Sequence, residues 1–336
     1  MAVLAGELPD RVPYVENGID FPFMCRLLER ELPFGKYFDS GEYQTPPMDY
    51  QLETNRLLHR DNVKFDLQPP IPAHKIPGAN QILFYHDGYV KTWDDLERLQ
   101  FPDLGDPSLR HEIAEFLAQK GDYATIMASR VGISATYLAM GMEHFYVTLL
   151  DDRDLVEEVF RRYTDWTAQA VYLAAEMGFD IFWTSDDIAA KNGPLWSPEL
   201  FHEVFWPHAQ KVANAVRDVG IKWIFHSDGD LWKVLPELVG LGITGLNPIE
   251  PACMDIGEVR NAFPELVLVG NVDVDLLTRG TPDKVREAVR MLMRDVAPHG
   301  RFLAASGNSL ASYCDVDNVM AMTDAIVELG SYSKGA

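Results

Sequence analysis

Short apolar runs that end in polar residues recur along the chain, and amphipathic stretches such as 197–220 lie between them. The runs are rich in Val, Ile, Leu and Phe, which is typical of buried strands that alternate with helices. Eight segments show the pattern, namely 12–17 (VPYVEN), 63–67 (VKFDL, the weakest), 124–130 (ATIMASR), 179–187 (FDIFWTSDD), 221–229 (IKWIFHSDG), 242–250 (GITGLNPIE), 265–273 (ELVLVGNVD) and 301–309 (RFLAASGNS).

Strands that alternate with helices predict parallel βαβ units, and eight such units predict an α/β fold, a closed (β/α)8 TIM barrel. An open, doubly wound sheet is the alternative, but neither a GxGxxG nor a GxxxxGK phosphate-binding motif supports it. The range 18–115 is rich in Pro, Gly and charge and interrupts the rhythm. We interpret it as an N-terminal capping segment over the barrel mouth, within one domain that spans 1–336.

Composition limits the classes of binding partner and the cellular compartment that we expect for this chain. The 51 Asp and Glu outnumber the 29 Lys and Arg, and the net charge of −22 disfavours nucleic acid, anionic membranes and polyanionic substrates. The three cysteines form no CxxC pair, and the N-terminus MAVLAGELPDR lacks the features of a signal peptide. No stretch has the length of about 18 apolar residues that a membrane span needs. We therefore expect a cytoplasmic protein whose oligomeric state stays open, with a homodimer as one option.

Polar residues gather where the predicted strands end. Active sites of such barrels lie at the C-terminal ends of the strands, so these side chains should face one cavity. Acids and a histidine in one cavity are what a general acid–base site or a metal site needs, although polar strand ends also occur in barrels without a site there. The residues concerned are Glu16, Asn17, Ser129, Arg130, Asp186, Asp187, His226, Asp228, Asn247, Glu250, Asn271, Asp273, Ser306 and Asn308.

A family resemblance rests on several segments in a fixed order. These are YHDGYVKTWDDLERLQFPD from residue 85, MGFDIFWTSDDIAAKNGPLWSPELFHEVFWPHAQKV, HSDGD, GLNPIEP, LVGNVDVDLLTRGTPDKVREAV and the C-terminal SGNSLASYCDVDNVMAM. Together they resemble the uroporphyrinogen decarboxylase superfamily, which includes methyltransferases that work with corrinoid proteins. The resemblance implies a (β/α)8 barrel, in agreement with the strand count.

Departures from the family pattern favour one branch. The decarboxylases hold their polycarboxylate substrate with an arginine-rich segment after the first strand, and here VENGIDFPFMCRLLE contains only Arg26 and no other basic residue. The thiol methyltransferases hold zinc with a His-x-Cys motif and a later cysteine, and those positions resemble His226, Asp228 and Asn308. Both sulfur ligands are therefore missing. A carboxylate and an amide in their place would bind zinc more weakly and would form a harder donor set.

The remaining branch removes a methyl group from a methoxylated or methylated donor and passes it to the cob(I)alamin of a partner corrinoid protein. We expect His226 to be the general acid or a metal ligand at the leaving oxygen, with Asp187 and Glu250 orienting it or sharing the metal. Asp186 and Asp187 should point to opposite faces, with Asp187 inward and the other acid capping the following helix. A Zn²⁺ ion would be held by His226, Asp228 and Glu250, with Asp187 as a further candidate ligand.

Five residues at or near the strand ends are expected to bind the substrate. Asn17, Arg130, Trp183, Asn247 and Asn308 are the expected substrate-binding residues. Aromatic rings near the mouth favour an aryl ether as the donor, whereas rings that only pack in the core would leave a small aliphatic methyl donor. The aromatic residues are Tyr14, Phe21, Phe23, Trp183, Trp196 and Trp206. A decarboxylase-like lyase, a methylcobamide:thiol methyltransferase and a non-catalytic binding protein are the alternatives.

Overall fold

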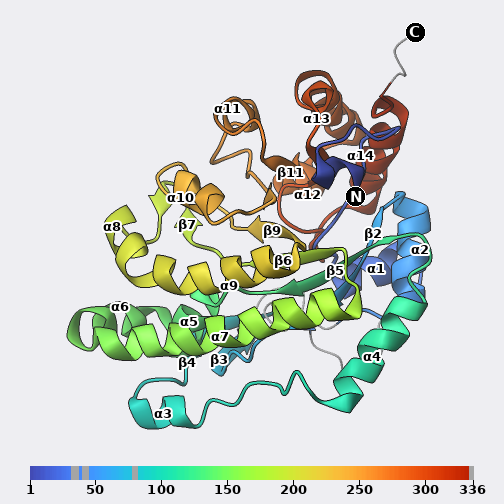
Figure 1. The fold of residues 1–336 in the computed structure, drawn as a ribbon. Coiled ribbons are helices and arrows are strands. Elements are labelled where there is room, and N and C mark those ends of the chain that lie inside the picture. The colour runs from blue at the N-terminus through green and yellow to red at the C-terminus, as the bar shows by residue number, and fades with distance from the viewer. Residues whose placement is uncertain (32–37, 40–44, 78–81, 333–336) are drawn as a thin grey trace.

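Seven parallel strands form one curved sheet in a computed structural model of the chain, which describes residues 1–31, 38–39, 45–77 and 82–332 (Figure 1). Along the sheet the order is β12, β11, β10, β9, β6, β5, β2, so each strand lies beside its neighbour in the chain. Their bounds are β2 Asn62–Asp66, β5 Ala124–Ser129, β6 Ile181–Ser185, β9 Lys222–His226, β10 Gly245–Asn247, β11 Val267–Val272 and β12 Phe302–Ser306.

The first predicted strand closes this sheet into a barrel. Tyr14 forms a parallel bridge with Ala304 of β12, and on its other side the Tyr14 carbonyl accepts a hydrogen bond of 2.8 Å from the Asp61 N–H. One residue further, the side-chain amide of Asn62 pairs with both backbone groups of Glu16 at 3.1 Å. The segment 12–17 thus joins β12 to β2, and the predicted (β/α)8 TIM barrel is confirmed.

Strand alternation separates two apolar cores. In β6, Ile181 and Trp183 point into the barrel, whereas Phe182 packs against the surrounding helices. The short helix η1 (Ala2–Ala5) adds two further residues to the interior core. That interior core consists of Val3, Leu4, Val15, Ile126, Ala128, Ile181, Trp183, Ile224, Val267, Val269, Leu303 and Ala305. It fills the barrel below the mouth, so a site can open only at the C-terminal ends of the strands.

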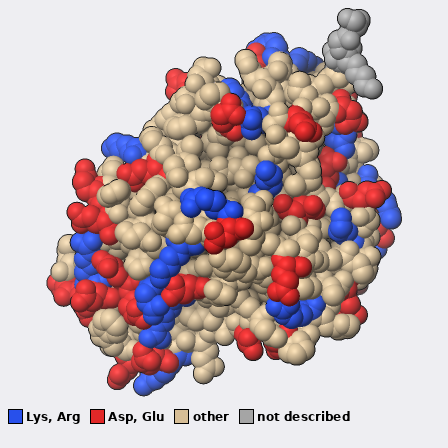
Figure 2. Space-filling model, viewed as in Figure 1, with Lys and Arg blue, Asp and Glu red and all other residues tan. Residues whose placement is uncertain are grey.

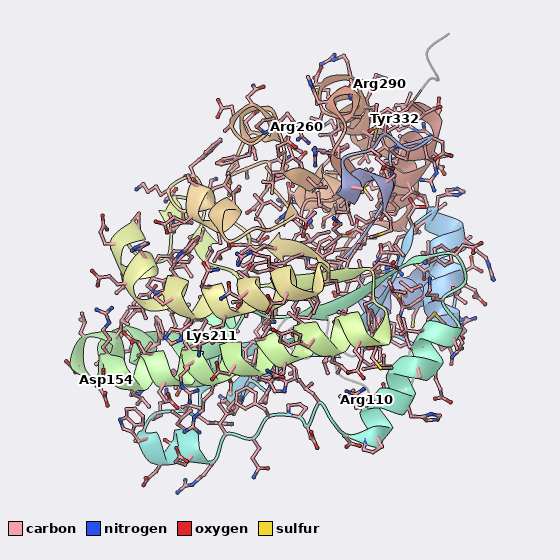
Figure 3. All side chains as sticks on the ribbon, in the orientation of Figure 1. Arg110, Asp154, Lys211, Arg260, Arg290 and Tyr332 are labelled. Atoms are coloured by element: carbon pink, nitrogen blue, oxygen red, sulfur yellow. The ribbon has the colours of Figure 1, made fainter. Side chains whose placement is uncertain are left out.

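Helices surround the barrel, and the long helices α7 (Arg153–Met177) and α9 (Trp206–Val219) lie side by side (Figure 1). Lys211 of α9 reaches Asp165 of α7 at 2.6 Å, and Arg110 of α4 (Pro107–Ala118) reaches Glu176 of α7 at 2.6 Å. Figure 3 labels Lys211 and Arg110 on these helices. These exposed pairs contribute little each. The helices are α1 Phe21–Leu27, α2 Met48–Leu58, α3 Trp93–Glu97, α4 Pro107–Ala118, α5 Ile133–Met140, α6 Met142–Asp151, α7 Arg153–Met177, α8 Pro198–Leu200, the π-helical turn η3 Phe201–Phe205, α9 Trp206–Val219, α10 Leu235–Gly240, α11 Ile256–Ala262, α12 Val274–Arg279, α13 Pro282–Asp295, η4 Ala297–His299 and α14 Val316–Leu329.

The range 18–115, which we expect to cap the barrel mouth, also contains β2, the barrel strand that the segment 63–67 predicted. After β2 the chain forms the hairpin of β3 (Ala73–Pro77) and β4 (Ile82–Gly88), whose second strand also pairs with β1 (Phe38–Asp39). This hairpin contacts α5, the helix that follows β5. Parts of the range, 32–37, 40–44 and 78–81, lie outside the described residues.

The charges of the chain are spread over its surface. Figure 2 shows Asp and Glu mixed with Lys and Arg over the face seen in Figure 1. Within the described ranges, no helix combines the length and the apolar character that crossing a membrane would demand.

Candidate active site

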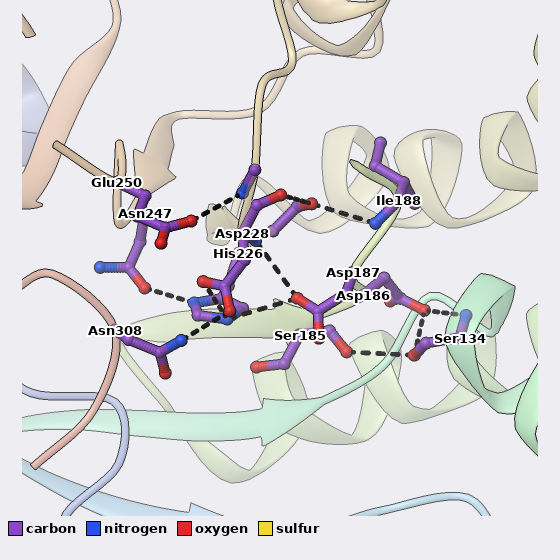
Figure 4. A network of polar contacts seen from close by, with 12 residues as sticks. Ser134, Ser185, Asp186, Asp187, Ile188, His226, Asp228, Asn247, Glu250 and Asn308 are labelled. Carbon is purple, nitrogen blue, oxygen red and sulfur yellow. Dashed lines mark hydrogen bonds and ion pairs between the residues drawn. The ribbon is translucent and has the colours of Figure 1, made fainter. Parts of the chain in front are cut away.

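A histidine and two carboxylates meet at the mouth of the barrel (Figure 4). His226 is the last residue of β9, and its Nε2 lies 3.7 Å from Asp187 Oδ1 and 3.7 Å from Asp228 Oδ1. One ligand atom of each of the three residues lies within 4.8 Å of the others. We call these three residues the donor group. The end of β6 supplies one member, and β9 with its following loop supplies the other two.

Asn247, beside His226 on β10, determines which ring nitrogen faces the carboxylates. The Asn247 Nδ2 donates to the Val269 carbonyl at 3.2 Å, so its Oδ1 must be the atom that lies 2.6 Å from His226 Nδ1. An amide oxygen only accepts, and Nδ1 therefore carries the proton. In the neutral ring, the lone pair of Nε2 then points at the two carboxylates, which is the state that a metal ligand requires.

Asp228 has one satisfied and one unsatisfied oxygen. Its Oδ2 accepts a hydrogen bond of 2.6 Å from Asn308 Nδ2. Its Oδ1 is buried and receives no hydrogen bond from the residues that the structure describes. Burial raises the pKa of Asp228 to about 7, although His226 opposes the shift. A cation beside Oδ1 would satisfy this oxygen, and one imidazole with two carboxylates is a donor set that suits Zn²⁺, so the residues fit a catalytic zinc site.

The adjacent acids Asp186 and Asp187 have different environments. Asp187 is half-exposed, and its Oδ1 accepts a hydrogen bond of 3.2 Å from the Asp228 N–H. Asp186 is buried and accepts from the backbone N–H of Val131, from the Ser134 N–H at 2.9 Å and from the Ser134 Oγ at 3.0 Å. It therefore caps α5, the helix that follows the neighbouring strand β5. The sequence had suggested instead that this acid caps the helix after its own strand, β6. Asp186 consequently has a structural role, and a catalytic role for it is not supported.

Glu250 lies next to the donor group but is not part of it. Its Oε2 accepts hydrogen bonds of 3.2 Å from the Gly229 N–H and of 3.2 Å from the Cys253 thiol. Gly229 has φ +88°, and a Cβ there would stand 2.7 Å from the Ala189 backbone. Glu250 thus holds the tight turn after His226, and the three residues that could hold a metal include Asp187, the alternative ligand named from the sequence, and not Glu250.

The five expected substrate-binding residues are engaged within the protein. Asn17 donates to Ser185 Oγ at 3.0 Å, and Asn308 and Asn247 contact Asp228 and His226 as described. Arg130 Nη1 contacts the Ser134 Oγ at 2.9 Å and the Ser185 carbonyl at 3.0 Å. Trp183 is 0% exposed within the interior core, so it cannot stack on a substrate. Direct substrate binding by Asn247, Arg130 and Trp183 is therefore not supported.

A narrow cleft opens beside His226 and contains residues that the sequence pattern had not singled out. Lys64 and Asp66 of β2, and Gln68 just after it, line the wall that faces the histidine. The available signal was the alternation of polar and apolar residues in NVKFD, with Asn62, Lys64 and Asp66 on one face. The complete lining is Asn17, Gly18, Lys64, Asp66, Gln68, Ala128, Ser185, His226, Asn308 and Ser309.

The aromatic residues named from the sequence do not line this cleft. Trp196 packs on Phe205 with ring centroids 4.5 Å apart, and Phe21 packs on Tyr50 at 4.9 Å. Tyr14, Phe23 and Trp183 are buried in the cores. Stacking of these rings on a substrate is therefore not supported.

Comparisons with known proteins agree with this fold. The family model described as uroporphyrinogen decarboxylase (URO-D) matches residues 85–329. A methylcobamide:CoM methyltransferase, MtbA, from Methanosarcina acetivorans is 23% identical over 70% of this chain and 68% of its own length. A uroporphyrinogen decarboxylase from Dichelobacter nodosus is 29% identical over 40% of this chain and 37% of its own.

Solved structures share the fold across nearly the whole chain. A methyltransferase from Methanosarcina mazei superposes with a TM-score of 0.72 at 19% identity, over 97% of this chain and 96% of its own. A B12-independent methionine synthase from Shewanella sp. W3-18-1 has a TM-score of 0.61 at 11% identity, over 95% and 98%. The family model covers most of the barrel, including every residue of the donor group. The chain belongs to the uroporphyrinogen decarboxylase family.

Proposed function

We propose that this protein is a methyltransferase that removes the methyl group of a methoxylated substrate and passes it to the cob(I)alamin of a partner corrinoid protein. The observation that carries the proposal is the donor group, in which the His226–Asn247 hydrogen bond turns a lone pair toward two carboxylates. Asp187, His226 and Asp228 would hold a Zn²⁺ ion. Such an ion supplies Lewis acidity toward the ether oxygen, which must leave with negative charge.

The absence of sulfur from the donor group argues against thiol methylation. Cys25 and Cys314 are buried elsewhere in the core, and the Cys253 thiol donates to Glu250. Burial raises the pKa of Cys253 to about 11, so this cysteine stays a thiol at neutral pH and is a poor ligand. One imidazole and two carboxylates form a harder site, which suits an oxygen-containing substrate better than a thiolate.

The charge of the cleft argues against a polycarboxylate substrate. Lys64 is the single Lys or Arg among the described residues that line it, and Lys64 already pairs with Asp66 at 3.0 Å. A substrate with many carboxylates would need several cationic partners there. The relatives include both a decarboxylase and a methyltransferase, and this cleft favours the second kind of chemistry.

An aryl methyl ether is the first substrate class to test, although none of the described residues that line the cleft is aromatic. Its leaving group is a phenolate, and a phenol has a pKa near 10, whereas an alkoxide leaving group is several units more basic. The carbon–oxygen bond of an aryl ether therefore breaks more easily. A small aliphatic ether is the second class.

Anaerobic incubation with methoxylated benzoates and chemically reduced cobalamin tests the proposal. Absorption spectra should show conversion of cob(I)alamin to methylcobalamin with release of the phenol. The variant His226→Ala should lower the rate by at least about 10²-fold, as loss of a group acting at the leaving oxygen would. The matched control is His111→Ala, because His111 is an exposed histidine on α4. A zinc-loaded wild-type protein that transfers no methyl group from any ether would contradict the proposal.

A further inference from the structure

The two ring nitrogens of His226 are both engaged in the proposed zinc site. Nδ1 donates its proton to Asn247, and Nε2 faces the carboxylates of the donor group. A histidine held in this way has no proton to give to a substrate when the metal is bound. If the ether oxygen leaves as the proposed function requires, its proton must come from another side chain of the cleft.

Lys64 is the side chain in that cleft with a proton suited to the task. Val63 and Phe65 pack in the outer core, so the inward-facing residues of β2 are Asn62, Lys64 and Asp66, in order toward the mouth. The Lys64 ammonium lies 3.0 Å from Oδ1 of Asp66, the next inward-facing residue toward the mouth, so its side chain runs up the inner wall. The Lys64 and Asp66 side chains are only 9% and 1% exposed, although both line the cleft with His226.

The amide and hydroxyl side chains of the cleft are weaker proton donors. Asn17, Gln68 and Asn308 carry amides, and Ser185 and Ser309 carry hydroxyls, none of which releases a proton near neutral pH. An ammonium does so readily when a strong base forms beside it. The pairing with Asp66 also fixes the direction of the ammonium, which limits the entropy lost when it meets the substrate.

We propose that Lys64 is the general acid that protonates the leaving oxygen, an inference that rests on the proposed function. In this step the methyl carbon bonds to the reduced cobalt of the partner while its bond to oxygen breaks. The bonding pair stays on oxygen, which takes a proton from the Lys64 ammonium and leaves as a neutral hydroxyl group. Cobalt supplies the electron pair of the new bond, and solvent returns the proton to the Lys64 amine, so atoms and electrons balance.

A leaving-group series distinguishes this role from a structural ion pair. The rates of methyl transfer are measured with methoxybenzenes that carry zero, one or two nitro groups, because nitro groups make the phenolate a progressively better leaving group that needs less protonation. The variant Lys64→Met/Asp66→Asn removes the acid without leaving a buried unpaired charge. Lys64→Arg keeps the positive charge but cannot give up its proton.

Both variants should lose about 10²-fold or more with the unsubstituted ether and become close to wild type with the dinitro ether. Lys222→Met is the matched control, because Lys222 begins β9 at the opposite end of the barrel wall, and it should leave the whole series unchanged. Thermal unfolding followed by circular dichroism verifies that each variant is folded.

Three other outcomes would each overturn the idea in a distinguishable way. An equal loss with every ether would identify Lys64 and Asp66 as a structural pair. Full activity of Lys64→Arg would mean that the positive charge, and not the proton, matters. A wild-type protein that is inactive with all ethers would overturn the proposed function itself, and the role of Lys64 with it.

Discussion

The His226 Nδ1 lies 2.6 Å from the Asn247 Oδ1, and this contact decides what the histidine can do. Because the amide oxygen can only accept, it holds the proton on Nδ1 and leaves Nε2 as the ligand atom. Asn247, on the neighbouring strand β10, thus orients the imidazole ring whether or not a cation is bound. Residues that orient a histidine in this way are as much a part of a metal site as the ligands.

Removal of that amide should weaken the metal site without removing a ligand. Asn247→Leu, similar in volume, should lower zinc affinity about 10- to 100-fold, as loss of such a partner typically does. Competition with a chromophoric chelator measures the zinc affinity. Asn247→Asp keeps an acceptor oxygen and should retain most of the affinity. Equal zinc affinity in the wild type and Asn247→Leu would show that the ring is oriented by other contacts.

The neighbours Asp186 and Asp187 should give opposite phenotypes. Asp186→Ala leaves buried N–H groups at the start of α5 without an acceptor and should cost about 1–3 kcal/mol of unfolding free energy. Asp187→Ala removes a half-exposed carboxylate and should lower zinc affinity while changing stability little. Urea unfolding of the metal-free proteins and zinc titration measure the two effects. Comparable loss of zinc in both variants would contradict this division.

Glu16 should make stability depend on pH. Burial raises its pKa to about 7, although hydrogen bonds from Ser306 and Tyr14 oppose the shift. A carboxyl with a raised pKa binds a proton more tightly in the folded state, so its contribution to stability falls as pH rises from about 4.5 to about 7. The melting temperature of Glu16→Gln relative to wild type should therefore increase between pH 5 and pH 8. A difference that stays constant, or decreases, would mean that Glu16 is not the responsible group.

The turn after His226 should require glycine for reasons of space as well as conformation. Gly229 has φ +88°, and a Cβ would lie 2.7 Å from the Ala189 backbone. Gly178, at the end of α7, has φ +89° but open space around it. Gly178→Ala should cost roughly 1 kcal/mol, whereas Gly229→Ala should cost more and also displace Asp228, with loss of zinc affinity. Equal costs in chemical denaturation, with zinc binding intact, would show that the turn adapts.

The barrel could be predicted because its strands are strongly apolar and regularly spaced. Even the weak segment VKFDL proved to be part of β2, and 12–17 closes the barrel through only a few backbone hydrogen bonds. The cap over 18–115 stays a prediction, because charge and proline content do not place a segment relative to the barrel mouth, and the range also contains the strand that VKFDL had indicated. Periodicity identifies elements more securely than composition identifies their position.

The structure brings together three residues that the sequence had named for the site, and the details of their arrangement depend on distances that a sequence does not contain. His226, Asp187 and Asp228 stand at strand ends, and the inward alternation of Trp183, Ser185 and Asp187 indicates which acid faces the mouth. The same alternation places Trp183 in the interior core, below the barrel mouth. Whether Asn247 holds a substrate or a histidine is decided by one contact across β9 and β10, which no pattern along the chain encodes.

X-ray absorption spectroscopy of the zinc-loaded protein tests the central claim most directly, because it identifies the atoms that bind the metal. We expect one zinc per chain in a shell of nitrogen and oxygen atoms at about 2.0–2.2 Å, with an imidazole contribution that disappears together with the zinc in His226→Ala. A sulfur atom at about 2.3 Å, or full zinc occupancy in His226→Ala, would contradict a metal centre formed by Asp187, His226 and Asp228.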